Sequence, residues 1–179
     1  MTYVALLRGI NVGRAKRVAM ADLRALLEDL GYRDVRTLLN SGNVVFTTPK
    51  SAGTALAARI EEAMTRKLGV TAKVTVVSAS ELQAAVKGLP LATAGRDPSR
   101  LMVGFFRTPA DERRVDDLVR QKWAPDEVAT GPRAVYVWCP DGILESRAFE
   151  AIGRAAGDGM TTRNWSTVTK LLAMAGATP

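Results

Sequence analysis

Histidine is absent from this sequence of 179 residues, and cysteine occurs once, as Cys139. The absence of histidine excludes Ser-His-Asp and Cys-His catalytic systems, histidine general bases and histidine-ligated metals. A single cysteine excludes an internal disulfide bond and a cysteine zinc site. We therefore predict no metal site and no cofactor, and any catalysis would depend on carboxylate, lysine, tyrosine or thiol side chains, or on a borrowed cofactor.

Long apolar runs are also absent, because the longest extend over only a few residues. Neither a membrane-spanning segment nor a secretory signal is expected, and we predict a cytoplasmic protein without membrane contact. Hydrophobic residues make up 47% of the chain and charged residues 24%, which is typical of a globular protein. The length allows one domain or two small ones.

Positive charge exceeds negative charge, since 25 Lys and Arg residues stand against 18 Asp and Glu residues, for a net charge of +7. Such an excess favours a polyanionic partner, either nucleic acid or a phosphorylated small molecule. Arginine-rich chains can also be basic without binding a polyanion, so composition leaves both interpretations open. It does not indicate an oligomeric state.

Hydrophobic periodicity in the first half predicts the order strand, helix, strand, strand, helix, strand. Strand patterns cover residues 4–7, 35–39, 44–47 and 73–77, and helical spacing of apolar residues covers 23–30 and 56–68. This order is the split βαβ arrangement of ferredoxin-like folds.

The second half partly repeats that order. Strand patterns cover 101–106, 127–130 and 134–139, a helix begins at 108, another contains 149–152, and a last helix begins near 166. We predict an α+β protein with two ferredoxin-like halves and antiparallel sheets, the second half being degenerate. The predicted domains are 1–90 and 100–179, joined by a linker at 91–99 that is rich in turn residues.

The loop after the first strand carries the main candidate site. It contains four cations and an amide before the first acid of the chain: Arg8, Asn11, Arg14, Lys16 and Arg17. A loop with two glycines ahead of a helix can direct backbone N–H groups at a phosphate. The alternative is a glycine turn whose cations are solvated.

The hairpin turn between the second and third strands is expected beside that loop, because the topology places both at one edge of the sheet. Its Ser41 hydroxyl and Asn43 amide could bind the same ligand. A hairpin turn alone also accounts for these residues.

A third polar segment precedes the last helix and contains Thr162, Arg163 and Asn164. A hydroxyl, a guanidinium and an amide near a helix N-terminus could bind phosphate, and Trp165 could stack on a base or sugar. In the alternative interpretation Asn164 or Ser166 caps the helix, Arg163 is exposed and Trp165 belongs to the core.

Several of these segments resemble the bacterial domain-of-unknown-function family numbered 1697. The resemblance is carried by residues 5–13, by Met20 with 22–23, by 41–44, and by 162–165 with 167–168 and 170–171. It implies a bacterial cytosolic α+β protein with ferredoxin-like halves and no established activity. Arg14 stands where the resemblance implies a second consecutive glycine, and residues 143–147 differ from the small, basic stretch that it implies.

The leading hypothesis is a non-catalytic protein that binds a phosphate-bearing ligand, with nucleic acid ahead of free nucleotides. One alternative is an enzyme that acts on a small anionic substrate without histidine or metal chemistry, using Arg and Lys to stabilise charge. Another is a protein-interaction module whose basic loop binds an acidic partner. No acid/base carboxylate pair is evident, so the catalytic residues of the enzyme hypothesis are unknown.

Overall fold

The structure is a computed structural model that describes residues 1–13 and 17–176. It divides into two compact units, one formed by Met1–Ser80 with residues 171–176, and one formed by Glu81–Lys170. The two boundaries fall inside helices α3 (Ala79–Lys87) and α7 (Trp165–Met174). Independent domains at 1–90 and 100–179 stay a prediction.

The first unit has the predicted order of elements. They are β1 (Thr2–Arg8), α1 (Met20–Asp29), β2 (Arg33–Leu38), β3 (Asn43–Thr47), α2 (Gly53–Leu68) and β4 (Lys73–Ser78). The strands form an antiparallel sheet in the order β2-β3-β1-β4, in which β1 pairs with both β3 and β4. This is the strand order of a ferredoxin-like fold.

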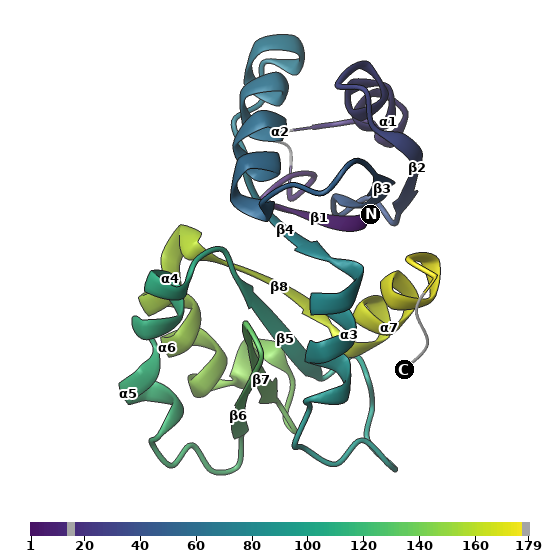
Figure 1. Cartoon of the computed structure of the whole chain (residues 1–179). Helices are drawn as coiled ribbons and strands as arrows, with labels where there is room; N and C mark the ends of the chain where they lie inside the picture. The colour runs from purple at the N-terminus through teal and green to yellow at the C-terminus, as the bar shows by residue number, and fades with distance from the viewer. Residues whose placement is uncertain (14–16, 177–179) are drawn as a thin grey trace. The chain divides into compact units, whose positions relative to one another are not determined.

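Helices α1 and α2 cover one face of this sheet (Figure 1). The apolar residues of α1 recur three and four positions apart, which places them on one side of the helix. The core between the helices and the sheet includes Tyr3, Ala5, Leu7, Leu23, Leu27, Phe46, Ile60 and Met64. Gly69 ends α2 in the left-handed conformation, with φ of 66°.

The second unit contains a second four-stranded antiparallel sheet. After α3 it is built from β5 (Leu101–Phe106), α4 (Pro109–Arg113), α5 (Asp116–Val119), β6 (Glu127–Gly131), β7 (Ala134–Trp138), η1 (Ile143–Glu145), α6 (Arg147–Ala156), η2 (Gly157–Gly159) and β8 (Met160–Asn164), followed by α7. The strand order β6-β7-β5-β8 repeats the order of the first sheet. Strands β5 to β8 therefore correspond to β1 to β4.

Both faces of the second sheet are covered within its own unit. Helices α4, α5 and α6 lie on one side and α3 lies on the other (Figure 1). On the α6 side, Met102, Phe106, Val137 and Ile152 pack in one core. On the α3 side, the buried Tyr136 hydroxyl donates a hydrogen bond of 2.5 Å to the Ala85 carbonyl oxygen.

The predicted fold class is confirmed, because both sheets are antiparallel, share the ferredoxin-like strand order and have helices between their strands. Two elements of the second unit differ from the sequence prediction. Residues 160–164 form a fourth strand, β8, that was not predicted, and the helix predicted from Thr108 is interrupted to give α4 and α5. Strand β8 completes the second β-α-β-β-α-β order.

Candidate functional site

The end of β1 and the turn between β2 and β3 meet at one edge of the first sheet. Leu6 is paired with Asn43 in the ladder between β1 and β3, and the Leu7 amide donates a hydrogen bond of 2.8 Å to the Gly42 carbonyl oxygen. The predicted juxtaposition of the basic loop with the hairpin turn is confirmed. It follows from the topology, because β1 and β2 run in the same direction and end at the same edge.

Asn11 ties the loop after β1 to that turn. Its amide nitrogen donates to the carbonyl oxygens of Val18, at 2.8 Å, and Asn40, at 2.7 Å, and its amide oxygen accepts from the Val18 amide at 2.8 Å. Its backbone is left-handed, with φ of 55°, a conformation that asparagine tolerates better than most residues. The Asn11 side chain therefore shapes the edge, and its hydrogen-bonding groups already have partners within the protein.

The turn itself is tightly packed under the loop. Gly42 has φ of 79°, and a Cβ atom there would lie 2.7 Å from the Leu7 Cβ atom and 2.8 Å from the Ile10 Cδ1 atom. Asn43 is fully buried and donates to the Leu38 carbonyl oxygen at 2.8 Å and to the Ser41 hydroxyl at 2.9 Å. Of the two predicted ligand-binding residues of the turn, Ser41 is exposed and Asn43 supports the backbone.

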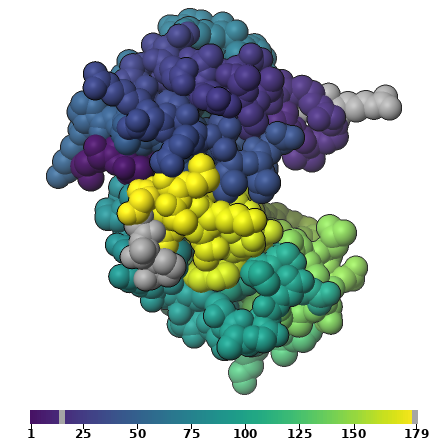
Figure 2. Space-filling view, turned by 90° about the vertical axis from the view of Figure 1, so that its right-hand side faces the viewer, coloured from purple at the N-terminus to yellow at the C-terminus, as the bar shows by residue number. Residues whose placement is uncertain are grey.

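The cations of the loop differ in their surroundings. Arg8 is half-buried and stands opposite Lys73 in the ladder between β1 and β4, whereas Arg17 is exposed. Arg14 and Lys16 lie outside the described residues. The described segments on both sides of them, coloured purple in Figure 2, lie at the surface of the first unit.

An open hollow lies between the loop, the turn and the start of α1. Its volume is about 420 Å³, and we call it the edge hollow; its lining is Asn11, Arg17, Val18, Ala19, Met20 and Asn40. Ala19 is the N-cap residue of α1 and provides no side-chain cap for the free N–H groups of the first turn. The edge hollow therefore combines the positive end of a helix with an exposed guanidinium.

Sequence reasoning found Asn11 and Arg17 but missed the rest of this lining. The available signal was the pair Val18 and Ala19 directly ahead of the helix, where Ser, Thr, Asp or Asn is the usual cap. A helix that begins without a capping side chain leaves its first N–H groups available to water or to a ligand.

The corresponding edge of the second unit is closed by its own side chains. Thr108, the N-cap of α4, accepts a hydrogen bond from the Asp111 amide, and the Asp111 carboxylate accepts from the Thr108 amide and hydroxyl. The Phe106 amide donates to the Arg133 carbonyl oxygen, as Leu7 does to Gly42. The helix start that corresponds to α1 thus has a capping box formed by its own side chains.

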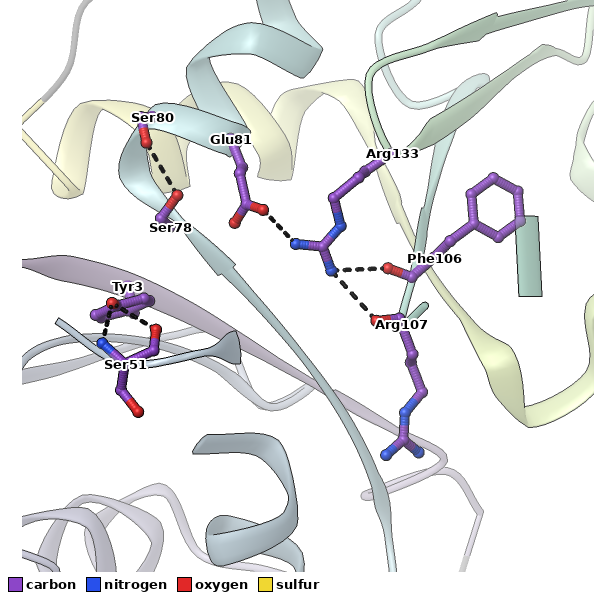
Figure 3. A network of polar contacts seen from close by, with 8 residues as sticks. All are labelled: Tyr3, Ser51, Ser78, Ser80, Glu81, Phe106, Arg107 and Arg133. Carbon is purple, nitrogen blue, oxygen red and sulfur yellow. Dashed lines mark hydrogen bonds and ion pairs between the residues drawn. The ribbon is translucent and has the colours of Figure 1, made fainter. Parts of the chain in front are cut away.

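Arg133 completes this closure, as Figure 3 shows. Its guanidinium donates to the Glu81 carboxylate at 2.5 Å and to the Phe106 carbonyl oxygen at 3.0 Å. A cation is present at this edge too, but its charge is paired with an acid of the same unit. The two corresponding edges therefore differ in chemistry although they share one topology.

The third predicted segment forms β8, and the alternation of side chains along a strand separates its polar residues. Arg163 is paired with Val103 and lies on the α3 side of the sheet, whereas Thr162 and Asn164 are paired with Gly104 and Met102 and lie on the α6 side. The three side chains do not converge on one ligand from one face of β8.

Arg163 and Asn164 also have structural contacts. Burial lowers the pKa of the Arg163 guanidinium to about 10, and this group donates to the Thr162 carbonyl oxygen at 2.7 Å. The Asn164 side-chain oxygen accepts from the Thr167 amide at 2.9 Å and thereby caps α7. Asn164 thus has the capping role that the alternative interpretation gave it.

The metal-ligating residue types and the single cysteine can be checked in the described part of the chain. No group of three or more His, Cys, Asp or Glu residues among residues 1–13 and 17–176 could hold a metal ion. Cys139 is fully buried, and burial raises the pKa of its thiol, which keeps the thiol protonated and unreactive. No helix of the described residues is long and apolar enough to cross a bilayer; the cytoplasmic location stays a prediction.

Comparison with known proteins is consistent with this fold. No curated protein matches the chain. A solved structure, described as a conserved bacterial protein SP0830 from Streptococcus pneumoniae, has a TM-score of 0.74 and 23% identity and covers 97% of this chain and 98% of its own. At that identity the likeness shows a shared fold. Residues 1–136 match the family described as "Protein of unknown function (DUF1697)", and the chain therefore belongs to this family.

Proposed function

We propose that the protein binds a phosphate-bearing ligand, either nucleic acid or a nucleotide, at the edge hollow of the first unit. Arg17 and Arg8, together with Arg14 and Lys16 of the same loop, would supply the positive charge. The N–H groups at the start of α1 would donate hydrogen bonds to phosphate oxygens. The single observation that carries the proposal is an uncapped helix start that opens into a hollow beside an exposed arginine.

The distribution of charge between the units supports this location. Between Met1 and Ser80 there are twelve Lys and Arg residues against six Asp and Glu residues, and no charged residue follows Leu171. Between Glu81 and Lys170 the counts are thirteen and twelve. The first unit therefore carries +6 of the total charge of +7, and an anion is attracted to it rather than to the second unit.

The contrast with the second unit also supports placing the ligand site in the first unit. At the corresponding edge the helix start is capped by Thr108 and Asp111, and Arg133 is paired with Glu81. In the second unit, which has the same topology, the protein's own side chains thus provide the hydrogen bonds and the opposite charge that this edge requires. In the first unit neither a capping side chain nor an acidic partner for Arg17 is present among the described residues.

The volume of the edge hollow and the charges around it restrict which ligand can bind and where. Ligand pockets commonly have volumes of roughly 300–1,000 Å³, and about 420 Å³ is room for one phosphate group with part of the molecule that bears it. Asp22, in the first turn of α1, repels an anion at the same end of the helix. The bound group must therefore lie on the Arg17 side of the helix start.

The test is fluorescence polarisation with labelled single-stranded RNA and labelled duplex DNA at low and at physiological salt, with nucleotides and inorganic phosphate as competitors. We expect Arg17→Ala to weaken binding by about threefold to tenfold, because it removes a charge-assisted contact. Asp22→Asn should strengthen binding, because it removes a repelling charge. Arg33→Ala is the matched control, since Arg33 is an exposed arginine at the opposite end of β2.

The salt dependence separates the two ligand classes. Nucleic-acid binding weakens steeply as salt rises, in proportion to the number of phosphates contacted, whereas a nucleotide competes at one saturable site. If neither nucleic acid nor any nucleotide binds at low salt, the proposal is wrong. It is also wrong if Arg17→Ala and Arg33→Ala have equal effects, since binding would then reflect net charge alone.

A further inference from the structure

Each of the two sheets has two outermost strands, called edge strands. The backbone N–H and C=O groups on the outer side of an edge strand need partners or protection. The edge strands are β2 and β4 in the first sheet and β6 and β8 in the second. Proteins protect such edges with bulges, charged side chains, proline or covering segments, because an open edge pairs with another chain.

Three of the four edge strands carry such features beyond their first residue. The pairing of β2 shifts register between Arg33 and Arg36, where Asp34 has a left-handed backbone with φ of 52°. On β4, the Val74 amide donates to the Glu61 carboxylate at 2.7 Å. Strand β8 carries the charged residue Arg163, and Met160, Thr161 and Arg163 all have interaction partners.

Strand β6 has one of these features, a charged residue at its first position, Glu127. It pairs with β7 over all five residues without a register shift, and residues 128–131 include neither a charged residue nor a proline. Beyond the ladder with β7, no described residue hydrogen-bonds to the backbone of residues 128–131. Its first residue, Glu127, is held by Arg96, whose guanidinium also lies 4.7 Å from the centre of the Trp138 ring. This anchor fixes the strand and leaves its outer edge open.

We infer that β6 pairs with β6 of a second copy of this chain, in antiparallel orientation about a two-fold axis. One strand can serve both copies, because antiparallel pairing of a strand with its own equivalent is self-complementary and closes as a dimer. The two four-stranded sheets then form one continuous antiparallel sheet. Backbone hydrogen bonds provide the contact, as they do when an extended segment adds to a sheet edge.

Charge favours a second copy as the occupant. The second unit carries a net charge of +1 and the first unit +6, so pairing through the second unit brings less like charge together than pairing through the first. The four residues that follow Glu127 in β6 are Val128, Ala129, Thr130 and Gly131, which offer neither an acidic nor a basic peptide a charged partner.

The experiment is sedimentation velocity of the full chain over a range of concentrations. Thr130 is exposed and paired with Val135. Thr130→Lys would bring like charges together across the two-fold axis, and we expect it to raise the dimer dissociation constant at least about tenfold. Thr37→Lys is the matched control, because Thr37 is paired with Val44 at the corresponding position of β2. Thr130→Ser should dimerise as the wild type does.

A concentration-dependent dimer that Thr130→Lys weakens and Thr37→Lys does not would support the inference. Circular dichroism of each variant verifies that it is folded. A wild-type chain that stays monomeric at the highest concentration would overturn the inference, as would a dimer that responds equally to both lysine variants. Neither result depends on ligand binding, so the inference and the proposed function fail independently.

Discussion

Asn11 provides a direct test of how the edge hollow is built. Its side chain makes three hydrogen bonds that hold Val18, just ahead of α1, and Asn40, in the turn between β2 and β3. Asn11→Gly removes all three bonds while tolerating the left-handed backbone with φ of 55°. Asn11→Ala removes the same bonds and adds the cost of placing a Cβ atom in that conformation.

The size of the effect follows from these contacts. A hydrogen bond within a protein contributes roughly 0.5–1.5 kcal/mol, and water replaces part of that contribution because the Asn11 side chain is only half-buried. We therefore expect Asn11→Gly to lower the free energy of unfolding of the first unit by about 1–2 kcal/mol. Asn11→Ala should lower it by about 1 kcal/mol more than Asn11→Gly does.

Urea unfolding followed by circular dichroism measures this change, and amide hydrogen exchange locates it. We expect faster exchange at Val18 and at the first turn of α1 in both variants. Asn40→Ala is the matched control, because Asn40 contributes its backbone carbonyl oxygen, which the substitution keeps. If Asn11→Gly stays within about 0.5 kcal/mol of the wild type, a range usual for surface substitutions, Asn11 does not hold the edge together.

Two further predictions concern one buried residue in each unit. Gly42→Ala should destabilise the first unit by about 2–4 kcal/mol. The added Cβ atom would lie 2.7 Å from the Leu7 Cβ atom, and the backbone has φ of 79°. A melting temperature within 1 °C of the wild type would contradict this prediction. In the second unit, burial raises the pKa of Tyr136 to about 12 from its ordinary value of 10.0. The contribution of the protonated Tyr136 side chain to stability is therefore complete below pH 10 and is lost as the pH rises from 10 to 12. Absorbance titration at alkaline pH should show a tyrosine ionisation near pH 12 in the wild type that is lost in Tyr136→Phe.

Much of the fold could be predicted from the sequence because apolar periodicity is strong where elements are buried on one side. The strands at 4–7, 44–47 and 73–77 consist mainly of residues that the structure buries. Strand β8 lacks that signal, since it contains one apolar residue, Met160, followed by two threonines, Arg163 and Asn164. It is a strand because β5 offers it a partner, and such tertiary pairing leaves no local pattern.

The candidate site was predictable to a smaller extent. Topology was sufficient to place the loop after β1 beside the turn between β2 and β3, and Leu7, Asn11 and Gly42 confirm that placement. The roles of individual polar residues were not predictable, because a sequence does not show which hydrogen bonds a side chain makes within the protein. Asn43 looks like a ligand-binding amide in sequence, yet it is fully buried and bonded to the turn.

The two units together explain why we propose ligand binding at only one of them. The ferredoxin-like order brings a helix start, a strand end and a hairpin turn to one edge in both units. In the second unit Thr108, Asp111, Arg133 and Glu81 satisfy that edge internally. In the first unit the N-cap residue of α1, Ala19, makes no side-chain capping bond, and the unit as a whole carries most of the net positive charge of the chain. The same topology therefore yields a closed structural edge in one unit and, in the other, an open edge whose remaining donors are available to an anion.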